Sequence, residues 1–382
     1  MNRGRPPGSR DLNERKDGMD ELKKARGLEL LRKLSESHGA PGCEDAVRRI
    51  FRLELGGEIF TDRSGNILCR RPGKSKTPRI MLTAHMDEVG LAVQAITRSG
   101  LIRFVPLGGW WAHTLPAKRV RILTREGREI VGVIGARPPH FLSEAERDKV
   151  LKFDDMFIDV GAESAQEVQE RMGISIGDTI VPESAFTPMH NPDLLLCKAF
   201  DNRVGMALIL QAAAELDQGL HPNCVFAVGT VQEEVGTRGA QTAAFSVNPD
   251  VAIVLEGAPA DDLPGTPEDE RQAVVGSGVQ VRLMDPSAIM NRKLADYVVR
   301  TARDHEIPHQ QAVRKSGGTD AKVIHLSGSG VPTIVLGVPA RYIHSHNSII
   351  HMSDYLATLE LVSRLLHSLD SETVDGFTSF DD

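Results

Sequence analysis

Aromatic residues and cysteines are both scarce in this chain of 382 residues. Phe, Trp and Tyr together make up 4% of it, which argues against a protein that stacks nucleic-acid bases on aromatic side chains. The four cysteines lie far apart and form no C-x-x-C pair, so we expect buried, reduced thiols and no disulfide framework. They are Cys43, Cys69, Cys197 and Cys224.

The chain also lacks a strong charge of either sign and a long apolar run. Its 45 Lys and Arg stand against 52 Asp and Glu, a net charge of −7 that does not suit a nucleic-acid partner. No stretch reaches the ~20 apolar residues of a membrane span, and residues 1–18 lack the apolar core of a secretory signal. We therefore expect no nucleic-acid or membrane partner, a cytoplasmic protein, and a disordered N-terminal extension over residues 1–19.

The pattern of apolar residues changes twice along the chain. Residues 20–92 and 189–368 alternate apolar runs with segments of helical spacing, which predicts an α/β fold. Between them, residues 93–188 hold many short β-rich runs separated by Gly and Pro, such as LIRFVPL and EIVGVIG. We expect one discontinuous α/β domain, a β domain inserted into it, and a frayed acidic tail over residues 369–382.

Side chains that bind metals stand where the apolar runs end. His85 ends RIMLTAH, Asp201 precedes the helix-like DNRVGMALIL, Glu233 and Glu234 follow CVFAVGTV, Glu256 ends VAIVLE, and His344 comes shortly after PTIVLG. Open α/β sheets bind ligands beyond the carboxyl ends of their strands, so these side chains should converge at one edge.

Each of these residues is weak evidence by itself, and only their joint pattern indicates a function. A histidine at a strand end is more often structural than a ligand, and an aspartate before a helix is most often its N-cap. Two imidazoles and three carboxylates can nevertheless hold two zinc-like ions and leave a place for water. Asp201 can span both ions, and Asp87 can accept a hydrogen bond from His85 on the same face of an extended segment. Glu233 is not needed among these five metal ligands, so it is free to act as a base.

The motifs TAHMDEVG, KAFDNRVG, QEEVGTRGA, VLEG, GGTDA and RYIHS resemble metallopeptidase family forty-two, the tetrahedral aminopeptidases and glutamyl aminopeptidases of microbes. The resemblance extends from about Lys24 to Leu366. It implies a three-layer, zinc-aminopeptidase-like catalytic domain with a mixed sheet, and a small inserted β-barrel-like domain that joins subunits. The implied activity is hydrolysis of N-terminal residues from short peptides, by dimers that assemble into a tetrahedral dodecamer.

The same resemblance implies two divalent metal ions in each subunit, with zinc favoured over cobalt or manganese, and it assigns roles by position. Asp201 bridges the ions, Glu234 and His344 complete one metal site, and His85 and Glu256 complete the other. Glu233 is the general base acting on a water that bridges the metals, and Asp87 is the carboxylate that supports His85.

Several positions depart from the common pattern of that family. Glu256 stands where many relatives have Asp, and GGWWAHTLPAKR replaces a more usual GGWD-type stretch. His346 in RYIHSHNS stands where many relatives have Pro, so it is an alternative to His344 as the ligand. By resemblance Thr319 and Asp320 line the substrate cleft, although the sequence gives them no separate role.

Two other functions suit parts of this pattern. An amidohydrolase of the same architecture, removing acyl groups from amino acids or sugars, would use the same two-metal chemistry, and a binding protein could keep the fold without activity. The run GISIG at 173–177 matches a serine-hydrolase elbow, but a β-like run with Pro182 follows where that motif requires a helix. The preferred N-terminal residue and the native metal stay open.

Overall fold

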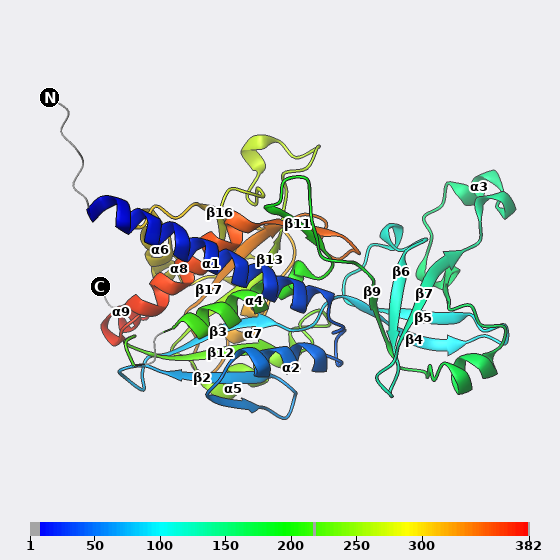
Figure 1. Cartoon of the computed structure of the whole chain (residues 1–382), viewed down its shortest axis with the longest axis horizontal. Coiled ribbons are helices and arrows are strands. Elements are labelled where there is room, and N and C mark those ends of the chain that lie inside the picture. The colour runs from blue at the N-terminus through cyan, green and yellow to red at the C-terminus, as the bar shows by residue number, and fades with distance from the viewer. Residues whose placement is uncertain (1–7, 217–218, 381–382) are drawn as a thin grey trace.

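The computed structural model describes residues 8–216 and 219–380 of the chain. The strands in these residues form a mixed sheet, a closed barrel and a small three-stranded sheet (Figure 1). In Figure 1 the mixed sheet and its helices occupy most of the long axis, and the barrel lies at one end.

The mixed sheet is built around four parallel strands. Its order is β1-β2-β12-β3-β13-β17-β14-β15, with β16 beside β14. Strands β12, β3, β13 and β17 run parallel to one another, whereas β2 and β14 run antiparallel to their central neighbours. The bounds are β1 (Glu58–Thr61), β2 (Ile67–Pro72), β3 (Arg79–His85), β12 (Cys224–Thr230), β13 (Val251–Pro259), β14 (Val279–Asp285), β15 (Ala288–Ile289), β16 (His309–Val313) and β17 (Thr333–Ala340).

The central strands are apolar along their whole length because helices cover both faces of the sheet. All residues of β3 after Arg79 are buried, and so are all residues of β17. Parallel strands with both faces buried have nearly continuous apolar runs and no alternation, which is the pattern of RIMLTAH and TIVLGVPA.

One layer of helices contains α4, which packs on β3 and β13, and α8, which packs on β17, with α1 lying across α4. Helices α5 and α7 pack together on the other face. The bounds are α1 (Gly8–Glu36), α2 (Asp45–Glu54), α3 (Glu144–Arg147), α4 (Phe200–Glu215), α5 (Arg238–Val247), α6 (Arg292–Asp304), α7 (Ala321–Ile324), α8 (Met352–Ser368) and α9 (Ser371–Gly376). Across the described ranges, every helix is too short or too polar to cross a bilayer.

The barrel has an apolar core of its own, which includes Leu91, Ile122 and Ile158. Its strands neighbour one another in the order β4-β5-β8-β7-β6-β9. They are β4 (Gly90–Ile96), β5 (Ile102–Leu107), β6 (Arg119–Leu123), β7 (Glu129–Ala136), β8 (Met156–Asp159) and β9 (Thr179–Pro182), and the small sheet comprises β10 (Thr187–Pro188), β11 (Leu194–Cys197) and β18 (Ser348–His351). A mixed α/β sheet with a closed β barrel confirms the predicted fold class, whereas the domain boundaries at residues 93 and 188 stay a prediction.

Within the described residues, both terminal segments contain more helix than we expected. Helix α1 begins at Gly8, inside the extension expected to be disordered, and continues without a break into its buried part; residues 1–7 lie outside the described ranges. The tail contains α9, whose N-cap Asp370 accepts a hydrogen bond from the backbone N–H of Thr373. Val374 and Phe377 are buried, so the prediction of a frayed tail was wrong as far as Phe377.

Candidate metal centre

The carboxyl ends of the parallel strands open onto one cleft. His85 ends β3, Glu256 lies in β13, and Glu233 and Glu234 follow β12. A cavity of about 170 Å³ lies among these side chains. It is lined by His85, Asp201, Glu233, Glu234, Glu256, Gly257, Pro259, Arg282, Arg314, Ser316, Gly317, Gly318, Thr319, Ile343 and His344. The structure therefore brings together residues that are spread over most of the chain.

Asp201 stands between the two histidines. Its Oδ1 lies 3.2 Å from Nε2 of His85, and its Oδ2 lies 3.2 Å from Nε2 of His344. Each histidine also faces a second carboxylate. Oε1 of Glu256 is 3.2 Å from Nε2 of His85, and Oε2 of Glu234 is 3.4 Å from Nε2 of His344. The result is two histidine–carboxylate pairs joined by one shared aspartate.

Some carboxylate oxygens of this cluster are buried without a hydrogen-bond partner. They include Oε1 of Glu234 and Oε2 of Glu256, in a residue that is 4% exposed. Ligand atoms of His85, Asp201 and Glu234 all lie within 4.8 Å of one another. Because buried carboxylates ordinarily pair with or coordinate a cation, and because imidazole and carboxylate are the ligands that zinc-like ions accept, the residues present fit divalent metals.

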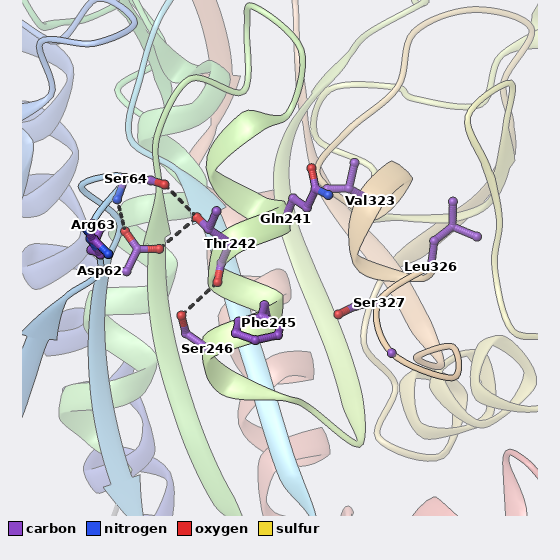
Figure 2. Close-up of a pocket in the computed structure, with 11 residues that line it drawn as sticks. Asp62, Arg63, Ser64, Gln241, Thr242, Phe245, Ser246, Val323, Leu326 and Ser327 are labelled. Atoms are coloured by element: carbon purple, nitrogen blue, oxygen red, sulfur yellow. Dashed lines mark hydrogen bonds between the residues drawn. The ribbon is translucent and has the colours of Figure 1, made fainter.

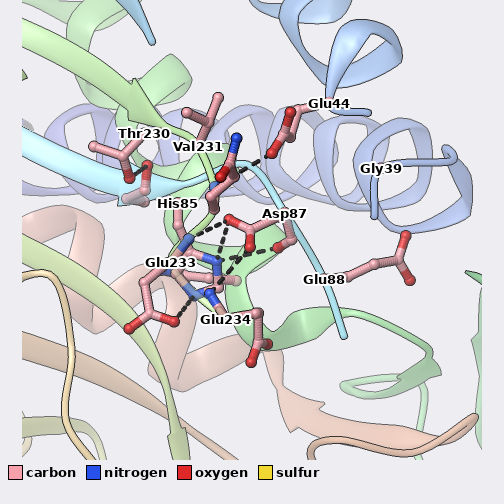
Figure 3. A network of polar contacts seen from close by, with 12 residues as sticks. Gly39, Glu44, His85, Asp87, Glu88, Thr230, Val231, Glu233 and Glu234 are labelled. Atoms are coloured by element: carbon pink, nitrogen blue, oxygen red, sulfur yellow. Dashed lines mark hydrogen bonds and ion pairs between the residues drawn. The ribbon is translucent and has the colours of Figure 1, made fainter. Parts of the chain in front are cut away.

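Asp87 holds the glutamate pair as well as the histidine (Figure 3). Its Oδ1 accepts the backbone N–H of Glu233 and its Oδ2 accepts that of Glu234, both at 3.0 Å. Nδ1 of His85 contacts the Asp87 carbonyl oxygen at 3.1 Å and the carboxylate Oδ1 at 3.4 Å. Asp87 therefore fixes the Glu233–Glu234 turn relative to His85, whereas the spacing predicted only a contact with His85.

Glu233 lies beside the two pairs without completing either. Its Oε2 is 3.9 Å from Nε2 of His85, and its side chain is 13% exposed. Burial raises the pKa of Glu233 well above its ordinary value; His85 opposes the rise, and the charges of Asp320 and Glu234 add to it. A carboxyl with a raised pKa holds a proton more readily once it has accepted one, and can then return it, as a general acid–base must.

The backbone around Asp201 is closely fitted to β13. A Cβ added at Gly257 would lie 2.9 Å from Cα of Asp201, so a larger residue there would displace it. Asn202 follows a cis peptide bond, and its Nδ2 donates to the carbonyl oxygen of Leu255 at 2.8 Å. These contacts join the start of α4 to β13 and place Asp201 beside Glu256.

The histidines and carboxylates shift one another's pKa values strongly. Burial alone would lower the pKa of His344, but the hydrogen bond to Asp201 and the charge of Glu234 raise it to about 10. Burial raises the pKa of Glu234 to about 8 against the opposing charge of His344, and it raises that of Glu256 to about 7 against the opposing charge of His85. Each of these protons sits on an atom that a metal ion would use, so protons and cations compete here.

A buried ion network beside the centre was missed from the sequence. The fully buried Lys198 donates to both carboxylate oxygens of Glu88, at 2.5 and 2.7 Å, and Nη2 of Arg203 donates to the same carboxylate at 3.1 Å. Burial lowers the pKa of Lys198 to about 8, and Glu88 opposes the shift. Glu88 follows Asp87, and the two cations flank Asp201 in the chain. The sequence did contain a signal for this network, because Glu88, Lys198 and Arg203 are charged residues that stand close to candidate ligands in otherwise apolar segments.

His346, the alternative ligand, lies outside the histidine–carboxylate cluster. Its Nε2 donates to the carbonyl oxygen of Arg119 at 3.0 Å, and burial lowers its pKa to about 4. The geometry therefore favours His344. Asp320 is 1% exposed and accepts a hydrogen bond from Oγ1 of Thr230 at 2.5 Å, so it is buried behind the cleft surface that it was expected to line.

A larger hollow, of about 890 Å³, lies away from these residues, between the turn after β1 and helices α5 and α7 (Figure 2). Its polar side chains bond to one another, as Oγ1 of Thr242 does to Oδ2 of Asp62 at 2.9 Å. Phe245 on α5 is 84% exposed there. None of the proposed metal ligands lines this hollow, so its exposed aromatic ring is independent of the candidate metal centre.

Comparisons with known proteins give one consistent result. The M42 glutamyl aminopeptidase family matches residues 65–361. The glutamyl aminopeptidase of Lactococcus lactis is 35% identical over 352 residues, which cover 91% of this chain and 98% of that protein.

Solved structures agree with this match. The TET aminopeptidase of the marine-sediment archaeon Thaumarchaeota archaeon SCGC AB-539-E09 is 39% identical, with a TM-score of 0.88 and coverage of 93% of this chain and 100% of that one. The TET1 peptidase of Pyrococcus horikoshii, which can assemble into a tetrahedron or a large octahedral shell, is 32% identical with a TM-score of 0.81. That match covers 90% of this chain and 100% of the other.

Proposed function

This chain belongs to the M42 glutamyl aminopeptidase family and is a peptide hydrolase, and we propose that it removes single N-terminal residues from short peptides with two divalent metal ions. Zinc is the first choice, and cobalt or manganese would suit the same nitrogen and oxygen ligands. The observation that carries the proposal is the placement of Asp201, with one oxygen 3.2 Å from each histidine nitrogen.

We assign one ion to His85, Glu256 and Asp201, and the other to His344, Glu234 and Asp201. The two separate histidine–carboxylate pairs support this division. When bound, divalent cations at these ligands would supply Lewis acidity toward the scissile carbonyl and a lower pKa for the attacking water. Asp87 would orient His85 and the Glu233–Glu234 turn, because it bonds to all three.

Glu233 is the proposed general base. It would accept the proton of the attacking water and return it to the amine that leaves. Its buried position, its raised pKa and its place outside the two ligand sets support this role. The free α-amino group of the substrate would lie among the carboxylates, and a cleft of about 170 Å³ leaves little room beyond one residue.

A panel of aminoacyl amides, assayed after chelation and with each metal added back, tests the proposal. We expect hydrolysis that is lost with the chelator and restored by one or more divalent ions. N-acetyl amino acids are the matched alternative substrates. Their hydrolysis in place of the aminoacyl amides would favour the amidohydrolase, and a metal-free protein without either activity would favour a binding role.

We also propose that dimers assemble into a tetrahedral dodecamer, with the barrel in contact between subunits. The support is the assembly of the Pyrococcus horikoshii relative into a tetrahedron or octahedral shell. Light scattering that found a fully active monomer would contradict it. A cytoplasmic location stays a proposal, which the four unpaired cysteines support.

A further inference from the structure

A second pocket adjoins the candidate metal centre. It has a volume of about 520 Å³ and shares Ile343 and His344 with the cleft. We call it the aromatic pocket, and define it by Trp111, His113, Lys118, Tyr342 and His346. The function proposed above gives no role to any of these five residues.

One wall of the aromatic pocket comes from GGWWAHTLPAKR, the stretch that departs from the common family pattern. This stretch is tied to the centre, because Nδ1 of His344 donates to the carbonyl oxygen of Gly109 at 2.7 Å. Trp110 is anchored in turn, since its Nε1 donates to the carbonyl oxygen of Gly90 at 2.8 Å. The backbone that leads into Trp111 is therefore anchored, while the Trp111 side chain is 66% exposed.

The exposed rings give the pocket an apolar face. Trp111 and His113 lie with ring centroids 4.8 Å apart, and Tyr342 is 51% exposed. An aromatic side chain left open to water at a fixed position gains most when it covers an apolar part of a ligand.

Two polar groups of the pocket have no hydrogen-bond partner in residues 8–216 and 219–380, but only one of them is open to a ligand. Nε2 of His346 donates to the carbonyl oxygen of Arg119, and Nδ1 of the same ring is unpartnered but buried. The ammonium group of Lys118 forms no hydrogen bond or ion pair in these ranges, and the side chain is only half-buried. A cation beside an apolar face matches the carboxylate end of a short peptide.

We propose that the aromatic pocket binds the part of the substrate that follows the scissile bond. The side chain of the first such residue would rest on Trp111 and Tyr342, and a free carboxylate would lie near Lys118. The pocket would thus favour di- and tripeptides with an apolar or aromatic second residue. This inference rests on the aminopeptidase activity proposed above.

The two volumes support this division of the substrate. Small-molecule sites usually have roughly 300–1,000 Å³, so a cleft of about 170 Å³ is small even for a dipeptide, whereas the aromatic pocket, at about 520 Å³, lies within that range. Ile343 and His344 line both spaces, so a peptide whose first residue fills the cleft would pass these two residues to enter the pocket.

The test compares substrates that share one N-terminal residue, X, chosen as the best from the panel. X-amide releases ammonia and cannot reach the pocket, X-Phe fills it, and X-Phe-amide lacks the free carboxylate. In the wild-type enzyme we expect kcat/KM to be highest for X-Phe. Trp111→Ala should lower the ratio of kcat/KM for X-Phe to that for X-amide by about tenfold.

Trp111→Phe keeps a ring and should recover most of that ratio. Lys118→Met should lower kcat/KM for X-Phe by about two- to fivefold and should remove most of the difference between X-Phe and X-Phe-amide. Phe245→Ala is the matched control. Phe245 is also an exposed aromatic residue but belongs to the separate hollow in Figure 2, so the change should leave the ratio unchanged.

A Trp111→Ala enzyme in which both substrates lose the same factor would overturn the inference, because the residue would then act on the whole site or on folding. A change in the mass of the assembly by light scattering would also overturn it, since the ring would then be a contact between copies. Failure of the wild-type enzyme to hydrolyse any of the three substrates would instead refute the aminopeptidase activity itself.

Discussion

Replacing Glu233 with Gln is the most direct test of the proposed proton transfer. The change keeps the shape of the side chain and removes the carboxylate that would take the proton. The Glu233–Glu234 turn should keep its position, because it is the backbone N–H of Glu233 that donates to Asp87, at 3.0 Å. The side chain itself comes no closer than 3.9 Å to Nε2 of His85, so little stability should be lost.

The expected loss follows from the role of a base. A positioned general base contributes about 10²- to 10⁴-fold, so kcat of Glu233→Gln should fall by that factor, or roughly 2.7–5.5 kcal/mol of barrier. Metal content should stay the same because Glu233 is in neither ligand set. Glu234→Gln is the matched control. The same chemical change one residue along removes a carboxylate 3.4 Å from Nε2 of His344, and metal should be lost with activity.

The pH profile gives a second measurement of the same residue. A base must be unprotonated, so activity is present above its pKa and lost as the pH falls through it. Because burial raises the pKa of Glu233, the acid limb of kcat/KM should lie above its ordinary 4.5 in the wild type and should disappear in Glu233→Gln.

The assay is release of ammonia from an aminoacyl amide, with metal content measured on the same samples by atomic spectroscopy. A Glu233→Gln enzyme that holds both metals and keeps kcat within about threefold of the wild type would refute the argument, because that loss is far below what a general base contributes. Loss of metal from this variant would show that Glu233 is a ligand.

Three further predictions concern stability and metal binding. Divalent metal at 100 times its dissociation constant should stabilise the fold by about 2.7 kcal/mol per site, seen as a higher midpoint of thermal unfolding that a chelator reverses. Glu88→Gln should cost about 3–5 kcal/mol in urea unfolding because it leaves Lys198 and Arg203 buried without their carboxylate, whereas Lys198→Met should cost less because Arg203 still pairs with Glu88. Phe377→Ala should lower the free energy of unfolding by about 3 kcal/mol because Phe377 is buried. An unchanged unfolding midpoint would show that the tail is frayed.

The sequence allows a residue to be placed when its position follows from the strand arrangement alone. His85 and Glu256 follow buried apolar runs, and parallel strands bring such residues to one edge. The choice between His344 and His346 was harder, because both follow the same strand. His344 has a φ of 55°, in the left-handed region, and its ring is held by the carbonyl oxygen of Gly109, 235 residues earlier in the chain. No local pattern reveals such a contact.

Other misses had different physical causes. The link from Asp87 to two backbone N–H groups depends on the turn geometry after β12, and the pairing of Glu88 with Lys198 joins residues 110 positions apart. Helix α9, in contrast, has a local signal that was overlooked. Asp370 is an N-cap, and two apolar residues, Val374 and Phe377, recur three positions apart as on one face of a helix.

Negative charge gathers at this centre. Glu233 and the three proposed ligand carboxylates, Asp201, Glu234 and Glu256, carry 4 × (−1) = −4 when ionised. Without a metal ion, the pKa of Glu234 is raised to about 8 and that of His344 to about 10, so protons offset part of this charge. Metal binding must displace such protons, so affinity should rise with pH from about 7 to 10 and protons should be released into a weakly buffered solution. Affinity independent of pH over that range would mean that the ions are held by other groups.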